Sequence, residues 1–472
     1  MSTNRIVKQL PRLAAVGLLL AASVVGLTLW QRSHEQTLPD VLFVVLDTTR
    51  ADHLPFYGYG RDTAPTLSAL AAGAVVFERA FATAPWTVPS HASMFTGEMP
   101  GALDIGWHQL RLRQDVPTMA ESFARAGYAT AGISQNRMLD TDSGFTRGFT
   151  RWANVQAGDT VGALRAALAS RGPHQPLFLF VNVLASHLPY NAPAEHQQAF
   201  VRQVPAERLR WLSAAKWQRL LRAYTNGSLS TIDLQTLTDL YDAGVHWADR
   251  QLGDLLATMD TAGLNSNLVV VVASDHGENL GDHGLFDHQL CIYNSLLHVP
   301  LLIYAPGRLP PQRITMLVSL KDLWKTIAEI AALPGSSAVP GVSMLAASRP
   351  LSPVVAEYDR PVPMVNGLAH CCPELDRNRF DRELTAVQEE RFKLIVPSTG
   401  GAELYDLEHD PGETENVLAS AQSPEALAAL ARLQLAAVAA AARTAGHAVE
   451  LNEADRQRLR ALGYLVDGPS DQ

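Results

Sequence analysis

The chain of 472 residues is 47% hydrophobic and 18% charged, which is enough apolar material for one large core and a smaller second domain. This composition excludes a disordered chain and a membrane protein with many spans. The net charge of -9 favours solubility, and the sequence has no basic stripe of the kind that binds nucleic acid. We therefore expect no nucleic-acid partner, and an anionic substrate would have to be attracted by a local site such as a metal ion.

The N-terminal segment has the pattern of a membrane anchor or an export signal. Three basic residues precede an uncharged run, Leu13–Trp30, whose length in a helix is about 27 Å, near the hydrocarbon thickness of a bilayer. A cleaved signal usually has a shorter apolar region, and Ala21–Ser23 is a weak cleavage site. We therefore favour residues 1–30 as a single uncleaved anchor with its basic end in the cytoplasm. Either alternative places the rest of the chain outside the cytoplasm, in the periplasm or at the cell surface.

After a polar linker at residues 31–39, apolar runs alternate with amphipathic helical stretches. The runs are continuous, as expected for central strands that are buried on both faces. They span residues 41–46, 129–133, 177–183, 268–273 and 300–304. The helical stretches span residues 66–72, 118–126 and 237–262. This alternation predicts an α/β fold with a mainly parallel central sheet and helices on both faces, and a site at the carboxyl ends of the strands.

The sequence changes in character after about residue 340. We predict a catalytic domain at residues 40–340 and a smaller C-terminal α+β subdomain at residues 341–472. Two short antiparallel strands, at residues 392–397 and 402–407, are joined by a glycine turn, and Ser423 begins an alanine-rich helix.

Reactive residues directly follow two of the predicted strands. Asp47 follows the run at 41–46, and Asp275 and His276 follow the run at 268–273. A carboxylate at the point where a buried strand emerges is unfavourable unless a cation or another partner meets it. A single Asp at a strand end is more often a helix cap, but for these two ends together we favour a divalent metal site.

A third reactive segment lies at residues 82–97, with the sequence ATAPWTVPSHASMFTG. Pro89 suits the first position of a helix that continues to about Phe95, so Thr87 would lie just before that helix. Its hydroxyl would then face the positive end of the helix dipole and free backbone N–H groups, which suit an alkoxide and an anionic ester. From this segment alone, Thr87 or Ser90 could equally be a simple capping residue.

Together, these segments resemble the sulfatase family within the alkaline phosphatase superfamily. Five segments match that family in chain order. The first metal-binding segment is DTTRADHLPFYGYG, the nucleophile segment is TVPSHASMFTG and the His-x-Pro-Tyr segment is ASHLPY. The second metal-binding segment is SDHGENLGDHGLFDH, and the closing segment is RFKLIVPSTGGAELYDLEHDPGETEN. The resemblance covers about residues 40–465. It implies an alkaline-phosphatase-like fold and the hydrolysis of an anionic ester at a metal site.

The nucleophile motif departs from that family in a way that changes the chemistry. Sulfatases use a formylglycine made from the first residue of a Cys/Ser-x-Pro-x-Arg motif, whereas this motif reads Thr87-Val88-Pro89-Ser90-His91. Thr87 is a secondary alcohol and cannot yield an aldehyde, so we expect no formylglycine. Relatives that act on phosphate esters use a Thr directly as the nucleophile. Water can cleave the resulting phosphothreonine, whereas a sulfated threonine would be hydrolysed slowly. The resemblance therefore favours a phosphoester over a sulfate ester.

The expected metal ligands also differ from those of the sulfatases. Family members place two adjacent Asp residues in the first segment and an Asp-Asn pair in the second, an oxygen cage that suits Ca²⁺. In this chain Thr48 takes the second Asp position and His276 takes the Asn position. The resemblance implies that Asp47, Thr87, Asp275 and His276 hold one divalent metal ion, and the imidazole favours Mn²⁺ or Zn²⁺ over Ca²⁺.

Other polar residues receive supporting roles from their positions and from the resemblance. Arg50 would bind the ester oxygens, with a surface salt bridge as the alternative. His187 matches a family histidine beside the leaving group. His288 replaces a family lysine and could protonate the leaving oxygen. His283 and Asn136 are weaker candidates.

These observations predict a membrane-anchored, extracytoplasmic hydrolase that cleaves a phosphate or sulfate ester through a covalent Thr87 intermediate. The substrate would be a small anionic ester or an envelope glycan or lipid. A phosphoethanolamine- or glycerophosphate-type transferase ranks lower, because those relatives usually have several membrane spans and this sequence predicts one. A non-catalytic protein that binds an anionic head group is the third alternative, and the full set of expected ligands argues against it.

Overall fold

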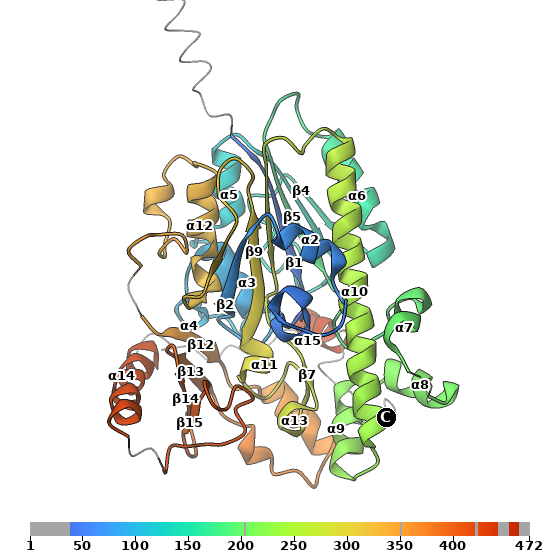
Figure 1. Ribbon diagram of the computed structural model, residues 1–472, viewed down its shortest axis with the longest axis vertical. Helices are drawn as coiled ribbons and strands as arrows, with labels where there is room; N and C mark the ends of the chain where they lie inside the picture. The colour runs from blue at the N-terminus through green and yellow to red at the C-terminus, as the bar shows by residue number, and fades with distance from the viewer. Residues whose placement is uncertain (1–37, 203, 350–351, 421–422, 442–452, 462–472) are drawn as a thin grey trace, which may run out of the picture. The chain divides into compact units, whose positions relative to one another are not determined.

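The computed structural model describes residues 38–472 except 203, 350–351, 421–422, 442–452 and 462–472 (Figure 1). The predicted anchor at residues 1–30 and residues 31–37 of the linker lie outside the described residues. All five predicted central strands are present, with bounds within two residues of the expected ones. They are β1 (Asp40–Leu46), β3 (Ala129–Ser134), β5 (Leu177–Val183), β6 (Leu268–Ala273) and β9 (His298–Tyr304).

These strands belong to a nine-stranded sheet with the order β10-β2-β9-β6-β1-β5-β3-β4, in which β11 also pairs with β2. The strands that the sequence did not predict are β2 (Val75–Phe81), β4 (Arg151–Asn154), β10 (Gln312–Ile314) and β11 (Val318–Ser319). In the described sheet, β9 is antiparallel to its neighbours β2 and β6, and the other pairings are parallel. The prediction of a mainly parallel sheet is confirmed.

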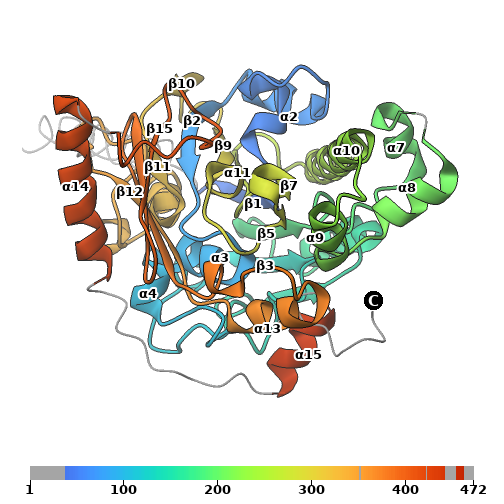
Figure 2. The same cartoon turned by 90° about the horizontal axis from the view of Figure 1, so that it is seen from below.

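Helices cover both faces of this sheet (Figures 1 and 2). The helices of one face are α2 (Pro65–Ala71), α6 (Thr160–Ala169) and α10 (Thr231–Thr261), and α7 (Ala194–Phe200) packs on α10 away from the sheet (Figure 2). Those of the other face are α3 (Thr87–Thr96), α5 (Met119–Arg125) and α12 (Leu323–Ile330). Helix α10 begins before the predicted start at residue 237, because Ser230 and Asp233 form a capping box that satisfies the first free N–H groups.

The strands of the sheet bring separate sequence segments to one edge. Strands β6, β1, β5 and β3 are adjacent and parallel, so their carboxyl ends meet at the same edge. Val45 of β1 pairs with Ala273 of β6 on one side and with Asn182 of β5 on the other. Asp47 and Asp275 each follow their paired residue by two positions, which places both carboxylates at the same level of the sheet.

A second, antiparallel sheet forms the core of a smaller C-terminal subdomain. Its strands, in spatial order, are β12 (Val354–Tyr358), β13 (Leu384–Gln388), β14 (Phe392–Pro397) and β15 (Glu403–Asp406). The last two confirm the predicted strands. The alanine-rich helix, α14 (Pro424–Ala441), is capped as expected by Ser423, whose hydroxyl accepts a hydrogen bond from the Ala426 N–H at 3.1 Å. It packs on this sheet through Leu433, which is buried with Val387 and Leu394.

Within the part of the chain that the structure describes, α14 is also the one helix whose length and composition would allow it to cross a membrane. One side of it belongs to the hydrophobic core of the C-terminal subdomain, through Ala426, Ala429, Leu433 and Ala437. The core of that subdomain accounts for this side of the helix, whereas Leu427, Leu435 and Val438 are exposed.

Candidate active site

Asp47 and Asp275 lie at the carboxyl edge of the sheet, and each has one carboxylate oxygen held by protein donors. Oδ2 of Asp47 accepts hydrogen bonds from the side-chain amides of Asn136 at 2.9 Å and Asn182 at 3.2 Å. Oδ1 of Asp275 accepts from the backbone N–H of Thr48 at 3.3 Å. The other two oxygens, Oδ1 of Asp47 and Oδ2 of Asp275, are buried and have no hydrogen-bond partner among the described residues. Each carboxylate therefore has a fixed orientation and one lone-pair oxygen left for another ligand.

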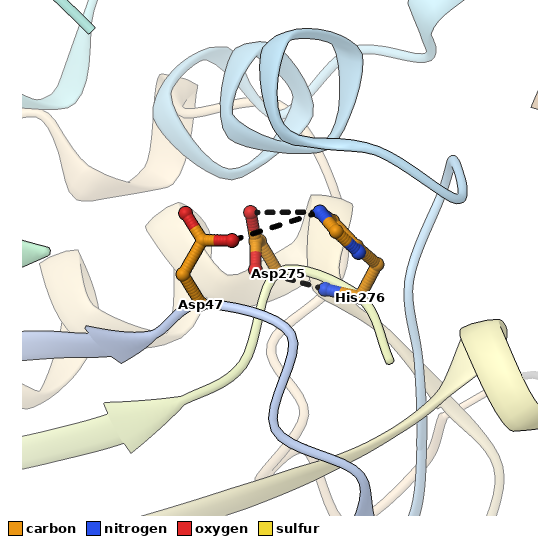
Figure 3. Close-up of side chains that lie close together, drawn as sticks. All are labelled: Asp47, Asp275 and His276. Atoms are coloured by element: carbon orange, nitrogen blue, oxygen red, sulfur yellow. Dashed lines mark hydrogen bonds and ion pairs between the residues drawn. The ribbon is translucent and has the colours of Figure 1, made fainter. Parts of the chain in front are cut away.

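His276 adds a neutral imidazole to these carboxylates. Its Nδ1 donates a hydrogen bond to the Gly277 carbonyl at 2.9 Å, so Nε2 carries a lone pair. Burial, together with the nearby ring of His288, lowers the pKa of His276 well below its usual 6.5, which keeps the ring neutral at physiological pH. Nε2 lies 3.4 Å from Oδ2 of Asp275 and 3.9 Å from Oδ1 of Asp47 (Figure 3). The lone pair thus faces the two carboxylate oxygens that lack hydrogen-bond partners.

Thr87 is the first residue of α3, and the expected helix start at Pro89 was wrong. Trp86 is extended (φ -151°, ψ 164°) and serves as the N-cap, so the helix begins two residues earlier. Pro89 is tolerated in the first turn because the N–H groups there have no helical partner. The Thr87 hydroxyl lies 3.5 Å from Nε2 of His276 and 3.3 Å from Nδ2 of Asn136. The structure therefore brings Thr87 to the cluster in spite of the shifted helix start.

The separations of these atoms fit a divalent metal ion. Ligands at about 2.0–2.1 Å from a tetrahedral metal ion lie about 3.3–3.4 Å from one another. Nε2 of His276 is 3.4 Å from Asp275 and 3.5 Å from Thr87. Burial raises the pKa of Asp275, which means that its charge is poorly compensated by the described residues, although the neighbouring His91 acts in the opposite direction. Asp47, Asp275 and His276 could therefore hold a divalent cation through two oxygens and one nitrogen.

The Arg50 guanidinium is held by two carboxylates and a backbone carbonyl. It donates through Nε and Nη2 to Asp52, at 2.9 and 2.8 Å, and through Nη1 to Asp282 at 2.9 Å and to the Glu278 carbonyl at 3.0 Å. These bonds engage all three guanidinium nitrogens, and the Arg50 side chain is 9% exposed. Arg50 therefore forms buried salt bridges, and its contact with the ester stays a prediction.

His288 lies between His276 and His187, and the predicted roles of His187 and His288 at the leaving group stay predictions. The ring centre of His288 is 4.3 Å from that of His276 and 4.9 Å from that of His187. His187 directs Nδ1 to the carbonyl of Leu188. It is 7% exposed, whereas His276 and His288 are fully buried, so His187 lies on the solvent side of the three rings.

The weaker candidates separate into two groups. Asn136 belongs to the cluster through its bonds to Asp47 and Thr87. His283 lies elsewhere: its ring stacks on Tyr293 with ring centres 3.6 Å apart, and it lines a cavity of about 590 Å³ against the C-terminal subdomain. The structure therefore offers no support for a direct role of His283 in the chemistry.

Two features of the site were not predicted. Asn182 is the one polar residue in the apolar run at 177–183, and this exception in the pattern was a usable signal. Thr48 adopts a left-handed conformation with a φ of 61°, which is strained for a β-branched residue, and this turn directs its N–H to Asp275. The hydroxyl of Tyr241 stabilises the turn by donating to the Thr48 carbonyl at 2.8 Å, a contact with no local sequence signal.

Comparison with known proteins agrees with this arrangement. Residues 39–333 match the Sulfatase family model, and residues 281–440 match the model for the C-terminal part of N-sulphoglucosamine sulphohydrolase. The chain belongs to the sulfatase family. It is an ester hydrolase, and the acidic and histidine cluster at the sheet edge corresponds to the metal dependence of that family.

Individual relatives of this sulfatase-family protein are distant but extend over most of its length. It is 24% identical over 450 residues to the choline-sulfatase of Rhizobium meliloti (strain 1021), covering 82% of this chain and 83% of the relative. It is 23% identical over 410 residues to arylsulfatase K of Xenopus laevis, covering 74% of this chain and 73% of the relative.

Solved structures show the same fold. The phosphonate monoester hydrolase of Agrobacterium radiobacter superposes with a TM-score of 0.67 at 20% identity, over 85% of this chain and 96% of that chain. A second structure, determined in complex with its substrate D-glucosamine-2-N,6-O-disulfate, superposes with a TM-score of 0.68 at 18% identity, over 86% of this chain and 98% of that chain. At these identities the likeness establishes the architecture of this sulfatase-family protein.

Proposed function

We propose that this sulfatase-family hydrolase cleaves a phosphoester, in preference to a sulfate ester, with Thr87 as the nucleophile. The observation that carries the proposal is the position of Oγ1 of Thr87, which lies 3.5 Å from Nε2 of His276. One divalent cation held by Asp47, Asp275 and His276 would lie beside that hydroxyl. Mn²⁺ or Zn²⁺ suits this mixed set of oxygen and nitrogen donors better than Ca²⁺ does.

The residues around Thr87 would prepare it for attack. A bound divalent cation supplies Lewis-acid chemistry, because it lowers the pKa of a coordinated hydroxyl and neutralises the non-bridging oxygens of the ester. Asn136 orients the hydroxyl by donating Nδ2 to Oγ1 at 3.3 Å. Because α3 begins at Thr87, free backbone N–H groups and the positive end of the helix dipole lie at the reacting oxygen.

The reaction would then proceed in two displacements. Oγ1 of Thr87 gives its proton to solvent and forms a bond to phosphorus while the bond from phosphorus to the leaving oxygen breaks, and His288 gives a proton to that oxygen. Water next attacks the phosphothreonine and gives a proton to His288, while the bond from phosphorus to Oγ1 of Thr87 breaks and Oγ1 takes a proton from solvent. His187 lies on the solvent side of the same group of rings, so it would contact the leaving group as it enters and departs.

We further propose that the protein acts outside the cytoplasm, held at the membrane by residues 1–30. This location rests on the basic residues and the uncharged run of the N-terminal segment. The substrate would be a small anionic ester or an ester group of an envelope glycan or lipid.

The proposal is tested by comparing the full chain with Thr87→Ala and Thr87→Ser on aryl phosphate, phosphodiester, phosphonate and sulfate esters, with the bound metal measured in parallel. Thr87→Ala should lose about 10³-fold or more of kcat/KM while retaining metal, and Thr87→Ser, which keeps a hydroxyl, should retain measurable turnover. Undiminished turnover by Thr87→Ala would refute the nucleophile. A higher kcat/KM on sulfate esters than on every phosphorus ester would refute the substrate class.

A further inference from the structure

A second group of metal-binding side chains lies next to the first. One carboxylate oxygen of Glu278, one of Asp287 and a ring nitrogen of His288 lie within 4.8 Å of one another. Nδ1 of His288 is 2.7 Å from Oδ1 of Asp287 and 3.6 Å from Oε1 of Glu278. Glu278 and His288 are fully buried and Asp287 is 3% exposed. Two carboxylates therefore face one imidazole in a place that excludes water.

The chain fold dictates this meeting. Strands β7 (Asn279–Leu280) and β8 (Phe286–Asp287) form a short antiparallel hairpin in which Asn279 pairs with Asp287. Glu278 and His288 flank that pair, so they lie together at the open end of the hairpin. Asp287 adopts the left-handed conformation with a φ of 66°, and its Oδ1 accepts a hydrogen bond from the His288 N–H at 2.6 Å. This conformation, uncommon for a residue other than glycine, places the Asp287 carboxylate beside the His288 ring.

The buried carboxylate of Glu278 is not satisfied by hydrogen bonds from the described residues. Both of its carboxylate oxygens are buried and have no hydrogen-bond partner among the described residues. Nδ1 of His288 lies 3.6 Å from Oε1 of Glu278 but only 2.7 Å from Oδ1 of Asp287. One imidazole proton cannot satisfy two carboxylates, and an unpaired buried carboxylate is strongly unfavourable. A divalent cation would bind one oxygen of Glu278, one oxygen of Asp287 and the imidazole lone pair of His288 at the same time.

We propose that Glu278, Asp287 and His288 form a binding site for a second divalent cation, separate from the one proposed beside Thr87. Two oxygens and one nitrogen are donors that suit Mn²⁺ or Zn²⁺. The site stands on its own geometry and does not depend on Thr87 being the nucleophile. It goes beyond the single metal ion that the sequence predicted.

The second cation would also determine how His288 acts, a consequence that rests on the proposed function. A cation on Nδ1 requires that nitrogen to be unprotonated, so the proton of the neutral ring lies on Nε2. The His288 ring is adjacent to those of His276 and His187, with centres 4.3 and 4.9 Å away. A fixed Nε2–H would then be the proton donor to the leaving oxygen.

The test is metal binding by the full chain, without any activity measurement. Metal-free protein is loaded with Mn²⁺ or Zn²⁺, dialysed and analysed by mass spectrometry for metal per chain, and the Mn²⁺ form is examined by electron paramagnetic resonance. The wild type should bind about two equivalents and give a spectrum broadened by two interacting Mn²⁺ ions. The isosteric double variant Glu278→Gln/Asp287→Asn should bind about one equivalent and give an isolated six-line spectrum.

Matched variants and crystals keep the test decisive. Asp47→Asn, in the first site, should also reduce binding to about one equivalent, but the remaining ion should then be lost on addition of Glu278→Gln/Asp287→Asn. Anomalous difference density in crystals of the Zn²⁺-loaded wild type should show a peak between Glu278, Asp287 and His288, and this result needs no variant to fold. A wild type that binds one equivalent, or a double variant that still binds two, would overturn the second site.

Discussion

Two buried clusters of charged side chains in this protein differ in how their charge is balanced. At the carboxyl edge of the large sheet, Asp47 and Asp275 each leave one oxygen without a partner among the described residues. In the C-terminal subdomain, Lys393 and Glu413 form an ion pair at 2.6 Å with side chains that are 0% and 1% exposed. Lys393 also donates hydrogen bonds to a backbone carbonyl at 2.8 Å and to Asn294 at 2.9 Å, so three oxygens surround its ammonium group.

The difference shows that buried charge alone does not mark a functional site. The Lys393–Glu413 cluster balances its charge within the chain through the ion pair, although Oε1 of Glu413 has no further hydrogen-bond partner among the described residues. It ties β14 to the segment that precedes β9. The cluster at Asp47 and Asp275 has fixed orientations but unmatched negative charge, which the proposed cation would balance. Unsatisfied acceptors that converge on one point therefore distinguish a ligand site from a structural ion pair.

The largest effect is expected for Asp275→Asn. Because the variant removes a charged ligand, it should lose the bound metal and lower kcat/KM by about 10³-fold or more. In the presence of a chelator, however, it should be at least as stable as the metal-free wild type, since a neutral amide replaces an uncompensated buried charge. Metal analysis, kinetics and urea unfolding with chelator measure the three effects. A chelated variant that unfolds well below the chelated wild type would contradict the comparison.

The opposite behaviour is expected for Lys393→Met. Removal of the cation leaves Glu413 buried and unpaired, which should lower the free energy of unfolding by about 3–5 kcal/mol without changing the metal content. The double variant Lys393→Met/Glu413→Gln should recover most of this loss, because neither charge remains. Urea unfolding of the three proteins measures the effect. A loss of metal in Lys393→Met that persists in the fully folded protein would show that the two clusters are not independent.

A smaller effect is expected at the amides that orient the ligands. Asn136→Ala should weaken metal affinity or kcat by about 10–100-fold, because Asn136 contacts both Asp47 and Thr87. Asn182→Ala is the matched control: Asn182 donates to Asp47 at 3.2 Å, and no bond to Thr87 is observed. It should therefore weaken metal binding while kcat at saturating metal stays near the wild-type value. Equal losses of kcat in the two variants at saturating metal would argue against the orienting role of Asn136.

The smallest effect is expected at a paired histidine outside the site. We assign no catalytic role to His108. Its hydrogen bond to Asp359, together with a further hydrogen bond to Asp104, raises the pKa of His108 from 6.5 to about 9. A raised pKa in the folded state means that the stabilisation is complete below about pH 6.5 and is lost as the pH rises through about 9. Because the side chain is 30% exposed, the effect should be about 1–2 kcal/mol. The difference in unfolding free energy between wild type and His108→Gln should fall between pH 6 and pH 9.5, and a constant difference would refute it.

The central strands were predictable because each is buried on both faces and is therefore apolar at every position. Strand β2 was missed because Glu78 and Arg79 interrupt its apolar pattern near the edge of the sheet, where both are partly exposed. Strands β10 and β11 are only three and two residues long and have no pattern of their own. Sequence periodicity thus reports burial, and it fails where a strand lies at an edge.

The site was predictable where its residues directly follow buried strands, as Asp47, Asp275 and His276 do. The environment of Arg50 was not, since the carboxylate of Asp282 that pairs with it is 232 positions away and only the folded chain brings them together. For the same reason, the sequence could not show that Glu278 lacks a partner. Whether a buried acceptor lacks a hydrogen-bond partner depends on three-dimensional packing, and no residue pattern encodes it.

The most direct test of the central claim is to look for the covalent intermediate. The metal-loaded full chain is mixed with an aryl phosphate, quenched with acid during the first turnover and digested for mass spectrometry. We predict a single phosphoryl group on the peptide that contains Thr87, which is absent in Thr87→Ala. An unmodified Thr87 peptide during demonstrated turnover, or a phosphoryl group on a different residue, would contradict the account.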